Sequence, residues 1–128
     1  MTQTKRRVLD VGQCVPDHYA ICALIEDHFD ANVEPAATAD EVFKAVAGDA
    51  YALILVNRVF DADGDCGLEL IRRLQADDAT RSVPVMLITN YPAAQAEAAA
   101  LGAQPGFGKA NLHDPATVDL LAQHLGPV

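Results

Sequence analysis

Short apolar segments alternate five times with segments of helical periodicity, and this alternation limits the possible folds more than any other feature of the chain. The apolar segments cover residues 7–11, 32–35, 51–56, 83–89 and 104–109. The helical segments cover residues 16–28, 38–48, 67–74, 92–101 and 115–125. Strands that alternate with helices in this way predict a parallel sheet with helices on both of its faces.

The order of the strands follows from the handedness of their connections. Right-handed crossovers predict an α/β, flavodoxin-like (βα)5 doubly wound sandwich, whose five-stranded parallel sheet has the order 2-1-3-4-5. The nearly uncharged run 51–56 is expected at the centre of the sheet, buried on both faces. Pro35 restricts the segment 32–35 to an edge of the sheet.

Two of the helices carry local signals in the sequence. Thr38 and Glu41 have the spacing of a capping box, which predicts a helix that starts at Thr38. In the helix before it, the spacing of Ala20, Ala23 and Leu24 predicts that these three residues share a buried face.

Length and composition indicate one globular domain over residues 1–128. A net charge of −9 argues against nucleic acid and anionic membranes as direct partners. No apolar stretch approaches the length of a membrane span, and the basic residues near the amino terminus are not followed by a signal-peptide core.

The three cysteines, Cys14, Cys22 and Cys66, form no CxxC pair, which favours a reducing cytoplasm. Cys22 is expected in the core. Cys14 and Cys66 lie on loops that should converge near the carboxyl edge of the sheet, so a redox pair, or a metal site with His18, stays open as an alternative.

Asn57 ends the central apolar run, at the point where doubly wound sheets place their ligands. A carboxylate at this position could attack a phosphoryl donor and help to hold a cation. An amide can do neither, because its nitrogen lone pair is delocalised and it carries no negative charge. Asn57 therefore argues against phosphoryl chemistry at this edge.

Several segments together resemble the receiver domain of bacterial two-component response regulators. They are residues 8–11, 51–56, 67–71, 83–89 and 101–103, followed by Lys109. No one segment is specific, but all five occur in the order and spacing of the family, and the resemblance extends over nearly the whole chain. The resemblance implies a flavodoxin-like signalling domain that is not an enzyme.

The resemblance also assigns roles to positions of this chain. The acidic pair that holds Mg²⁺ in receivers aligns with Gly12 and Gln13, and the phospho-accepting aspartate aligns with Asn57. The hydroxyl and the lysine that contact the phosphoryl group align with Thr89 and Lys109, and both are present. Because all three carboxylates are missing, we expect a degenerate pseudo-receiver with no cofactor and with weak or absent Mg²⁺ binding.

Two further positions depart from the family pattern. Ala110 replaces the proline that usually follows the lysine, so the peptide bond before it is expected to be trans. Gly106 aligns with the aromatic switch residue. The neighbouring Phe107 has the wrong strand parity for that role and is expected in the core.

Lys109 needs a partner once the carboxylates are gone, because an ammonium group in a crevice must be paired or hydrated. Asp10, one pleat deeper in the first strand, is a possible partner. The alternative is that Asp10 pairs with a basic residue of the amino-terminal segment or a nearby loop. Because Lys109 lacks the usual anions, Asn57→Asp is expected to restore a partner for it and to be neutral or mildly stabilising, within about 1 kcal/mol.

Asp61, Asp63 and Asp65 suggest a calcium loop, but an EF-hand needs glycine at its sixth position and glutamate at its twelfth. Those positions hold Cys66 and Arg72, so we reject a calcium site and expect a solvated acidic turn.

These observations predict a receiver-like module of the phosphorelay class that is not phosphorylated at the usual position and acts by protein–protein contact. The partner, or a second copy in a homodimer, would bind the fourth helix, fifth strand and fifth helix; alternatively, the alanine-rich residues 92–101 reflect helix propensity only. Another alternative is a switchable receiver that binds a small anion or nucleotide at Thr89 and Lys109. An enzyme on this fold finds no support, since the chain has no glycine-rich phosphate loop and no pair of carboxylates in the crevice.

Overall fold

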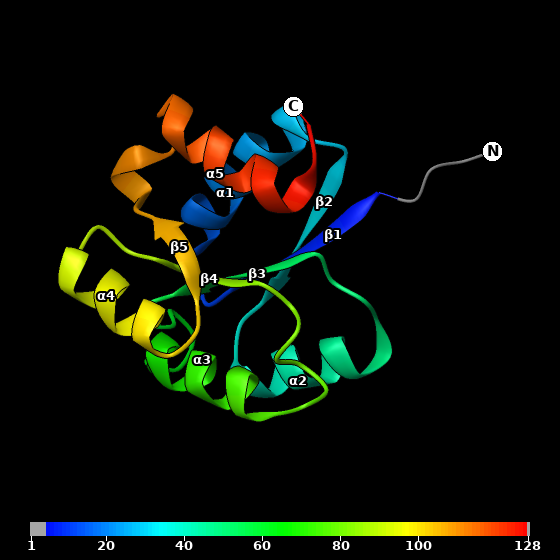
Figure 1. Cartoon of the computed structure of the whole chain (residues 1–128), viewed down its shortest axis with the longest axis vertical. Helices are drawn as coiled ribbons and strands as arrows, with labels where there is room; N and C mark the ends of the chain where they lie inside the picture. The colour runs from blue at the N-terminus through cyan, green and yellow to red at the C-terminus, as the bar shows by residue number, and fades with distance from the viewer. Residues whose placement is uncertain (1–4, 128) are drawn as a thin grey trace.

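The structure, a computed structural model, describes residues 5–127. Within them, five parallel strands form a sheet in the order β2-β1-β3-β4-β5 (Figure 1), which confirms the predicted fold and strand order. The strands are β1 (Arg6–Val11), β2 (Ala31–Ala36), β3 (Leu53–Asn57), β4 (Val85–Ile88) and β5 (Gln104–Phe107). The helices are α1 (Val15–His28), α2 (Ala39–Gly48), α3 (Gly67–Ala76), α4 (Pro92–Ala100) and α5 (Pro115–Leu125), with a 3-10 turn, η1 (Lys109–Asn111), before α5.

The helices form two layers, with α1 and α5 on one face of the sheet and α2, α3 and α4 on the other (Figure 1). Each face has its own apolar core. The central strand β3 serves both, because successive side chains of a strand point to opposite faces. Leu53 and Leu55 pack under α1 and α5, whereas Ile54 and Val56 pack under the other three helices.

The register of the sheet brings the ends of three strands together. Val11 of β1 lies opposite Val56 of β3, and Asn57 lies opposite Ile88 of β4. The residues that follow β1 and β4, and Asn57 itself, therefore meet at the carboxyl edge of the sheet.

The buried face of α1 differs from the one we expected. Ile21, Leu24 and Ile25 are buried, whereas Ala20 and Ala23 are exposed, so the prediction was right for Leu24 and wrong for the two alanines. The physical reason is that the larger isoleucines bury more apolar area against the sheet and so decide which way the helix faces.

The capping signal before α2 is confirmed at its start. The Thr38 hydroxyl accepts a 3.3 Å hydrogen bond from the backbone N–H of Glu41. The Glu41 carboxylate accepts from the N–H of Ala37 at 3.4 Å rather than from that of Thr38, so only half of the reciprocal capping box is present.

The fifth strand is shorter than expected. It ends at Phe107, which is buried as predicted, and Lys109 begins the turn η1 instead of ending the strand. The peptide bond before Ala110 is trans, as expected.

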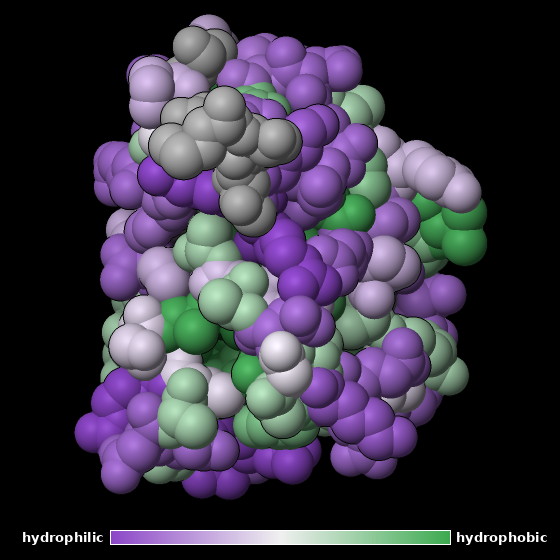
Figure 2. Space-filling view, turned by 90° about the vertical axis from the view of Figure 1, so that its right-hand side faces the viewer, coloured by the Kyte–Doolittle hydropathy of each residue, from purple (hydrophilic) through white to green (hydrophobic). Residues whose placement is uncertain are grey.

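Polar residues cover most of the side of the molecule shown in Figure 2, with a few apolar residues gathered around a small hollow. This polar covering agrees with the charge of −9. Among residues 5–127, no helix has both the length and the apolar character needed to cross a membrane.

Candidate functional site

A crevice of about 240 Å³ opens at the carboxyl edge of the sheet, between the ends of β3 and β4. Its lining residues are Asn57, Arg58, Val59, Ile88, Thr89, Asn90, Tyr91 and Lys109. It therefore joins three of the residues singled out in the sequence, namely Asn57, Thr89 and Lys109. Gly12 contacts this site through the side chain of Asn57, and Gln13 and Asp10 lie outside it, in a second pocket.

Asn57 is held by its side-chain nitrogen. That nitrogen donates hydrogen bonds of 2.9 Å to the carbonyl oxygen of Gly12 and 2.7 Å to the carbonyl oxygen of Val59. Both partners can only accept, so the amide nitrogen, and not its oxygen, must face them. A carboxylate in the same orientation would direct an oxygen at two carbonyl oxygens.

Gly12 has a backbone conformation that excludes an ordinary side chain. Its φ of +76° is in the left-handed region that favours glycine, and a Cβ added to it would lie 2.3 Å from Cδ1 of Phe60. Phe60 is 1% exposed, and the backbone N–H of Asp61 donates a 2.9 Å hydrogen bond to the carbonyl of Gly12. The start of the acidic loop thus packs over Gly12, the position that the sequence resemblance aligns with an acidic residue of receivers.

The acidic loop is a closed turn. The backbone N–H of Phe60 donates to the carbonyl of Asp65 at 2.9 Å, and the N–H of Gly64 donates back to the carbonyl of Phe60 at 2.8 Å. The Asp63 carboxylate accepts from the N–H of Asp65 at 3.0 Å. These bonds fit the acidic turn that we expected.

Lys109 pairs with Asp17 and not with Asp10. Its Nζ lies 2.7 Å from Oδ2 of Asp17, in the first turn of α1, and the two side chains are 31% and 37% exposed. This hydrogen bond holds the pKa of Asp17 below its usual range. Asp17 reaches Lys109 because α1 starts at the carboxyl edge of the sheet. Asp10, which we considered as a possible partner, lies deeper in the sheet, is buried under α1, and does not pair with Lys109.

Asp10, near the end of β1, pairs with His18, which lies in the first turn of α1. Nδ1 of His18 lies 2.7 Å from Oδ2 of Asp10, whose side chain is completely buried. Neither alternative that we considered, Lys109 or a basic residue from the amino-terminal segment or a loop, is its partner in the described structure.

Thr89 is buried, and its hydroxyl oxygen accepts a 3.2 Å hydrogen bond from the backbone N–H of Tyr91. The guanidinium of Arg58 lies 5.1 Å from the centre of the Tyr91 ring, in a cation–π contact at the mouth of the crevice. Arg58 thus adds a second cation beside Lys109.

These residues do not fit the Mg²⁺ ion that receivers bind. A hard divalent cation needs several oxygen ligands, most of them anionic. Here Gly12 offers no side chain, and Asn57 presents its nitrogen to the backbone. In the part of the chain that the structure describes, no group of three histidine, cysteine, aspartate or glutamate residues could hold a metal ion. The proposed alternative of a metal site with Cys14, Cys66 and His18 is therefore not supported.

The sequence reasoning missed three residues of this region, Asp17, Arg58 and Phe60, and it considered His18 only as a metal ligand. Asp17 follows Pro16 in the first turn of a helix that starts at the carboxyl edge, and this position could have suggested its role. The packing of Phe60 on Gly12 left no signal in the sequence, because it depends on the path of the loop.

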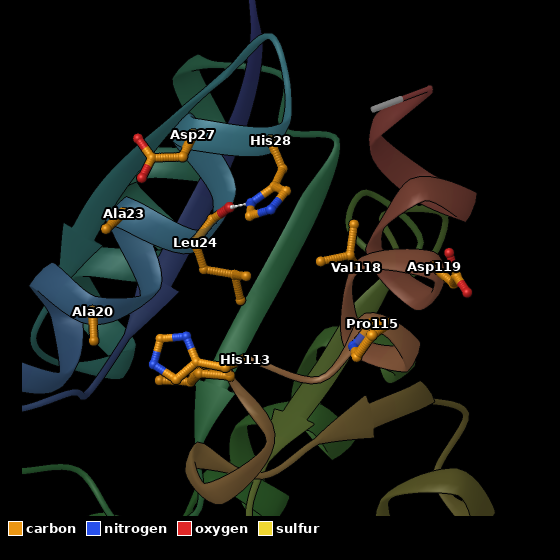
Figure 3. A pocket seen from close by; sticks show the side chains of 10 residues that line it. Ala20, Ala23, Leu24, Asp27, His28, His113, Pro115, Val118 and Asp119 are labelled. Atoms are coloured by element: carbon orange, nitrogen blue, oxygen red, sulfur yellow. Dashed lines mark hydrogen bonds between the residues drawn. The ribbon is translucent and has the colours of Figure 1, made fainter.

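A groove of about 550 Å³ lies between α1 and α5, away from the crevice (Figure 3). Leu24 and Val118 face each other across it, and Ala20 and Ala23 line its α1 side. Nδ1 of His28 is hydrogen-bonded to the carbonyl of Leu24 at 2.7 Å, so it is not free to bind a ligand. The two exposed alanines of α1 therefore face this groove and not the core.

Comparison with models of protein families finds no match, and comparison with curated proteins finds none either. Solved structures do match. A sensor protein from Polaromonas sp. JS666 is 18% identical, with 95% of this chain and 97% of that chain covered and a TM-score of 0.80.

Two further solved structures are described as receiver proteins. The signal receiver domain of a DNA binding response regulator protein from Colwellia psychrerythraea 34H is 17% identical, covers 93% of this chain and 97% of that chain, and has a TM-score of 0.77. A response regulator receiver protein from Pseudomonas putida is 15% identical, covers 95% and 99%, and has a TM-score of 0.77. This chain shares its fold with these receiver structures. At these identities the likeness establishes the fold alone, and function must be argued from the site.

Proposed function

We propose that this chain is a receiver-like signalling module that does not accept a phosphoryl group at Asn57 and acts through protein–protein contact. One observation carries the proposal: the Asn57 amide donates to two backbone carbonyls in the place where a receiver needs a nucleophilic carboxylate. The crevice is therefore built around a hydrogen-bond donor.

The rest of the crevice supports the same proposal. Phe60 occupies the space that a side chain at Gly12 would need, and Lys109 already has a carboxylate partner in Asp17. A phosphoryl group would thus meet neither a nucleophile nor a metal ion, and the lysine would have to leave its ion pair.

The position of the receiver's aromatic switch is also fixed here. The Gln95 amide of α4 donates to the carbonyl of Leu87 at 2.8 Å and accepts from the N–H of Gly106 at 3.3 Å. A Cβ at Gly106 would lie 2.2 Å from the Leu87 carbonyl oxygen. These bonds tie α4 to β4 and β5, which supports a surface of one fixed shape rather than a switched one.

The proposed contact surface consists of α4, β5 and α5. The outward side of α4 carries small exposed alanines at positions 93, 96, 99 and 100, which would allow close approach of a partner helix. A cytoplasmic location stays a prediction from the sequence.

Titration with Mg²⁺ and beryllofluoride, followed by the backbone amide spectrum, tests the proposal. We expect no change at residues 57, 89 and 109, whereas a phosphorylatable receiver measured alongside should show a second set of signals. A second set of signals at these positions would refute the proposal.

For the contact surface, the Ala96→Arg variant places a charged side chain on the outer side of α4. Ala79→Arg is the control, because it makes the same change at an exposed position in the loop between α3 and β4, outside the proposed surface. Sedimentation of the pure protein reports self-association, and capture from the source cells reports other partners. We expect Ala96→Arg alone to weaken whichever complex is found. Equal binding by both variants would exclude this face.

One alternative has a specific observation in its favour. Arg58 and Lys109 both line the crevice of about 240 Å³ beside the Thr89 hydroxyl, which is a suitable set of donors for a small anion or a nucleotide phosphate. Calorimetry with inorganic phosphate and with a nucleoside diphosphate tests it. Binding that is lost in the Arg58→Gln variant would support this alternative, and no binding would exclude it.

A further inference from the structure

A second pocket, of about 300 Å³, lies between the end of β2 and the start of α1 and shares no lining residue with the crevice. Its polar lining consists of Asp10, Gln13 and His18, and Tyr19 and Pro35 are among its apolar lining residues. Its volume is at the lower end of the range of ligand pockets, about 300–1,000 Å³. A few convergent polar groups against apolar walls are the usual composition of such pockets.

The polar groups of this pocket are incompletely satisfied. Asp10 is 1% exposed, and its Oδ1 has no hydrogen-bond partner within residues 5–127, although Oδ2 is bonded to His18. The two polar side-chain atoms of Gln13, Nε2 and Oε1, are also buried without a partner in the described chain. Buried polar atoms in folded proteins are nearly always paired, so three unpaired atoms in one pocket point to a missing partner.

Hydrogen bonds join three side chains at the base of the pocket. Burial raises the pKa of the Cys22 thiol to about 11, so the thiol keeps its proton, and its sulfur lies 3.3 Å from Nε2 of His18. Nδ1 of the same ring lies 2.7 Å from Oδ2 of Asp10. His18 therefore uses both ring nitrogens within the protein, and Oδ1 of Asp10 is the carboxylate oxygen left without a partner in the described chain.

The surroundings of Asp10 disfavour its ionised form. Burial raises the pKa of its carboxyl to about 6, although the hydrogen bond from His18 opposes the rise. The nearby Gln13 amide also opposes it, but makes no hydrogen bond to the carboxyl by distance and angle. A cationic N–H donor would pair with the free acceptor Oδ1 and would stabilise the ionised carboxylate.

We propose that this pocket binds a small planar cation of the amidinium or guanidinium class, with an apolar body. One N–H donates to Oδ1 of Asp10 and a second to Oε1 of Gln13. The apolar body lies against Tyr19, which is 67% exposed at the rim, and against Pro35. This site goes beyond the proposed function: it does not involve Asn57, Thr89 or Lys109, and its failure would leave the signalling proposal unchanged.

Three ligands of one shape and different charge test the proposal: benzamidine, benzamide and benzoate. We expect benzamidine to bind saturably, with amide shifts centred on residues 10, 13, 18 and 19. Benzamide, which is neutral, should bind at least tenfold more weakly, and benzoate should not bind.

Variants then locate the binding. Asp10→Asn should weaken benzamidine binding tenfold or more, and Tyr19→Ala, a substitution of an exposed side chain that should not disturb folding, should weaken it severalfold. Asp27→Asn is the matched control, since it removes an exposed carboxylate from the same helix α1 at the other groove, and it should leave binding unchanged. Absence of saturable benzamidine binding, shifts centred on the groove between α1 and α5, or equal affinity in Asp10→Asn would each overturn the proposal.

Discussion

The side-chain nitrogen of Asn57 lies 2.9 Å from the carbonyl oxygen of Gly12 and donates a hydrogen bond to it. The bond joins the end of β3 to the loop after β1. The same carbonyl accepts from the backbone N–H of Asp61 at 2.9 Å, so one oxygen ties three segments together. In this chain the carboxyl edge of the sheet is held by an amide.

This bond changes our expectation for Asn57→Asp, since Lys109 already has Asp17 and a carboxylate would face two carbonyls. We expect a loss of about 1–3 kcal/mol in the free energy of unfolding at pH 7. Denaturant melts measure it, with Asn57→Ala as the control that loses the bonds without adding charge. Asn57→Asp should be the less stable of the two. If both variants were as stable as the unmodified protein, the hydrogen bonds of the Asn57 amide would contribute nothing.

Gly12→Ala should destabilise the fold by about 2–4 kcal/mol, because it combines an unfavourable positive φ with a contact against Phe60. Phe60→Leu in the same protein should recover part of the loss, which a double-mutant cycle would detect. Gly48→Ala is the matched control, since a Cβ there meets no atom within 4 Å. That change should be neutral or slightly stabilising. Equal effects at the two glycines would contradict the packing described.

The pair of Lys109 and Asp17 should contribute little to stability. Both side chains are about a third exposed, so solvent screens the attraction, and we expect a coupling of at most about 1 kcal/mol. The pKa of Asp17 is lowered in the folded state, so this contribution is present at neutral pH and is lost as the pH falls through that lowered pKa. A cycle with Lys109→Met and Asp17→Asn, measured at pH 7 and in acid, checks both statements. A coupling that does not change with pH would contradict the second.

Asp10→Asn should stabilise the ligand-free protein at neutral pH. The pKa of Asp10 is raised from 3.8 to about 6, so the folded state keeps the proton longer and stability falls as the pH rises between these values. Each pH unit between them is worth about 1.4 kcal/mol, which sets an upper limit of about 3 kcal/mol on the gain at pH 7. The difference between variant and unmodified protein should shrink below pH 4. A variant that is less stable at pH 7 would show that the ionised Asp10 is stabilising.

The fold could be predicted from the sequence because the alternation of short apolar runs and helical periods is repeated at every step of the chain. The meeting of Asn57, Thr89 and Lys109 was also predictable, since the carboxyl ends of parallel strands share one edge. These features depend only on strand order and direction.

The contacts of the charged groups were not predictable in the same way. The pairing of Lys109 with Asp17 depends on how α1 is turned at its first residues, and the two isoleucines of that helix, not its alanines, decide this. The left-handed backbone of Gly12 and the ring packed on it depend on the path of the acidic loop. Asp10 did carry a signal, as an ionisable residue in an apolar strand, but nothing in the sequence showed which helix residue would bind it.

Intact-mass measurement after incubation with acetyl phosphate and Mg²⁺ tests the central claim most directly, with a phosphorylatable receiver treated in parallel. We expect the mass of this protein to stay unchanged while the phosphorylatable receiver gains one phosphoryl group, because the crevice presents an amide donor at Asn57. A stable phosphoryl adduct on any side chain of the crevice would contradict the proposal that this protein is not phosphorylated there.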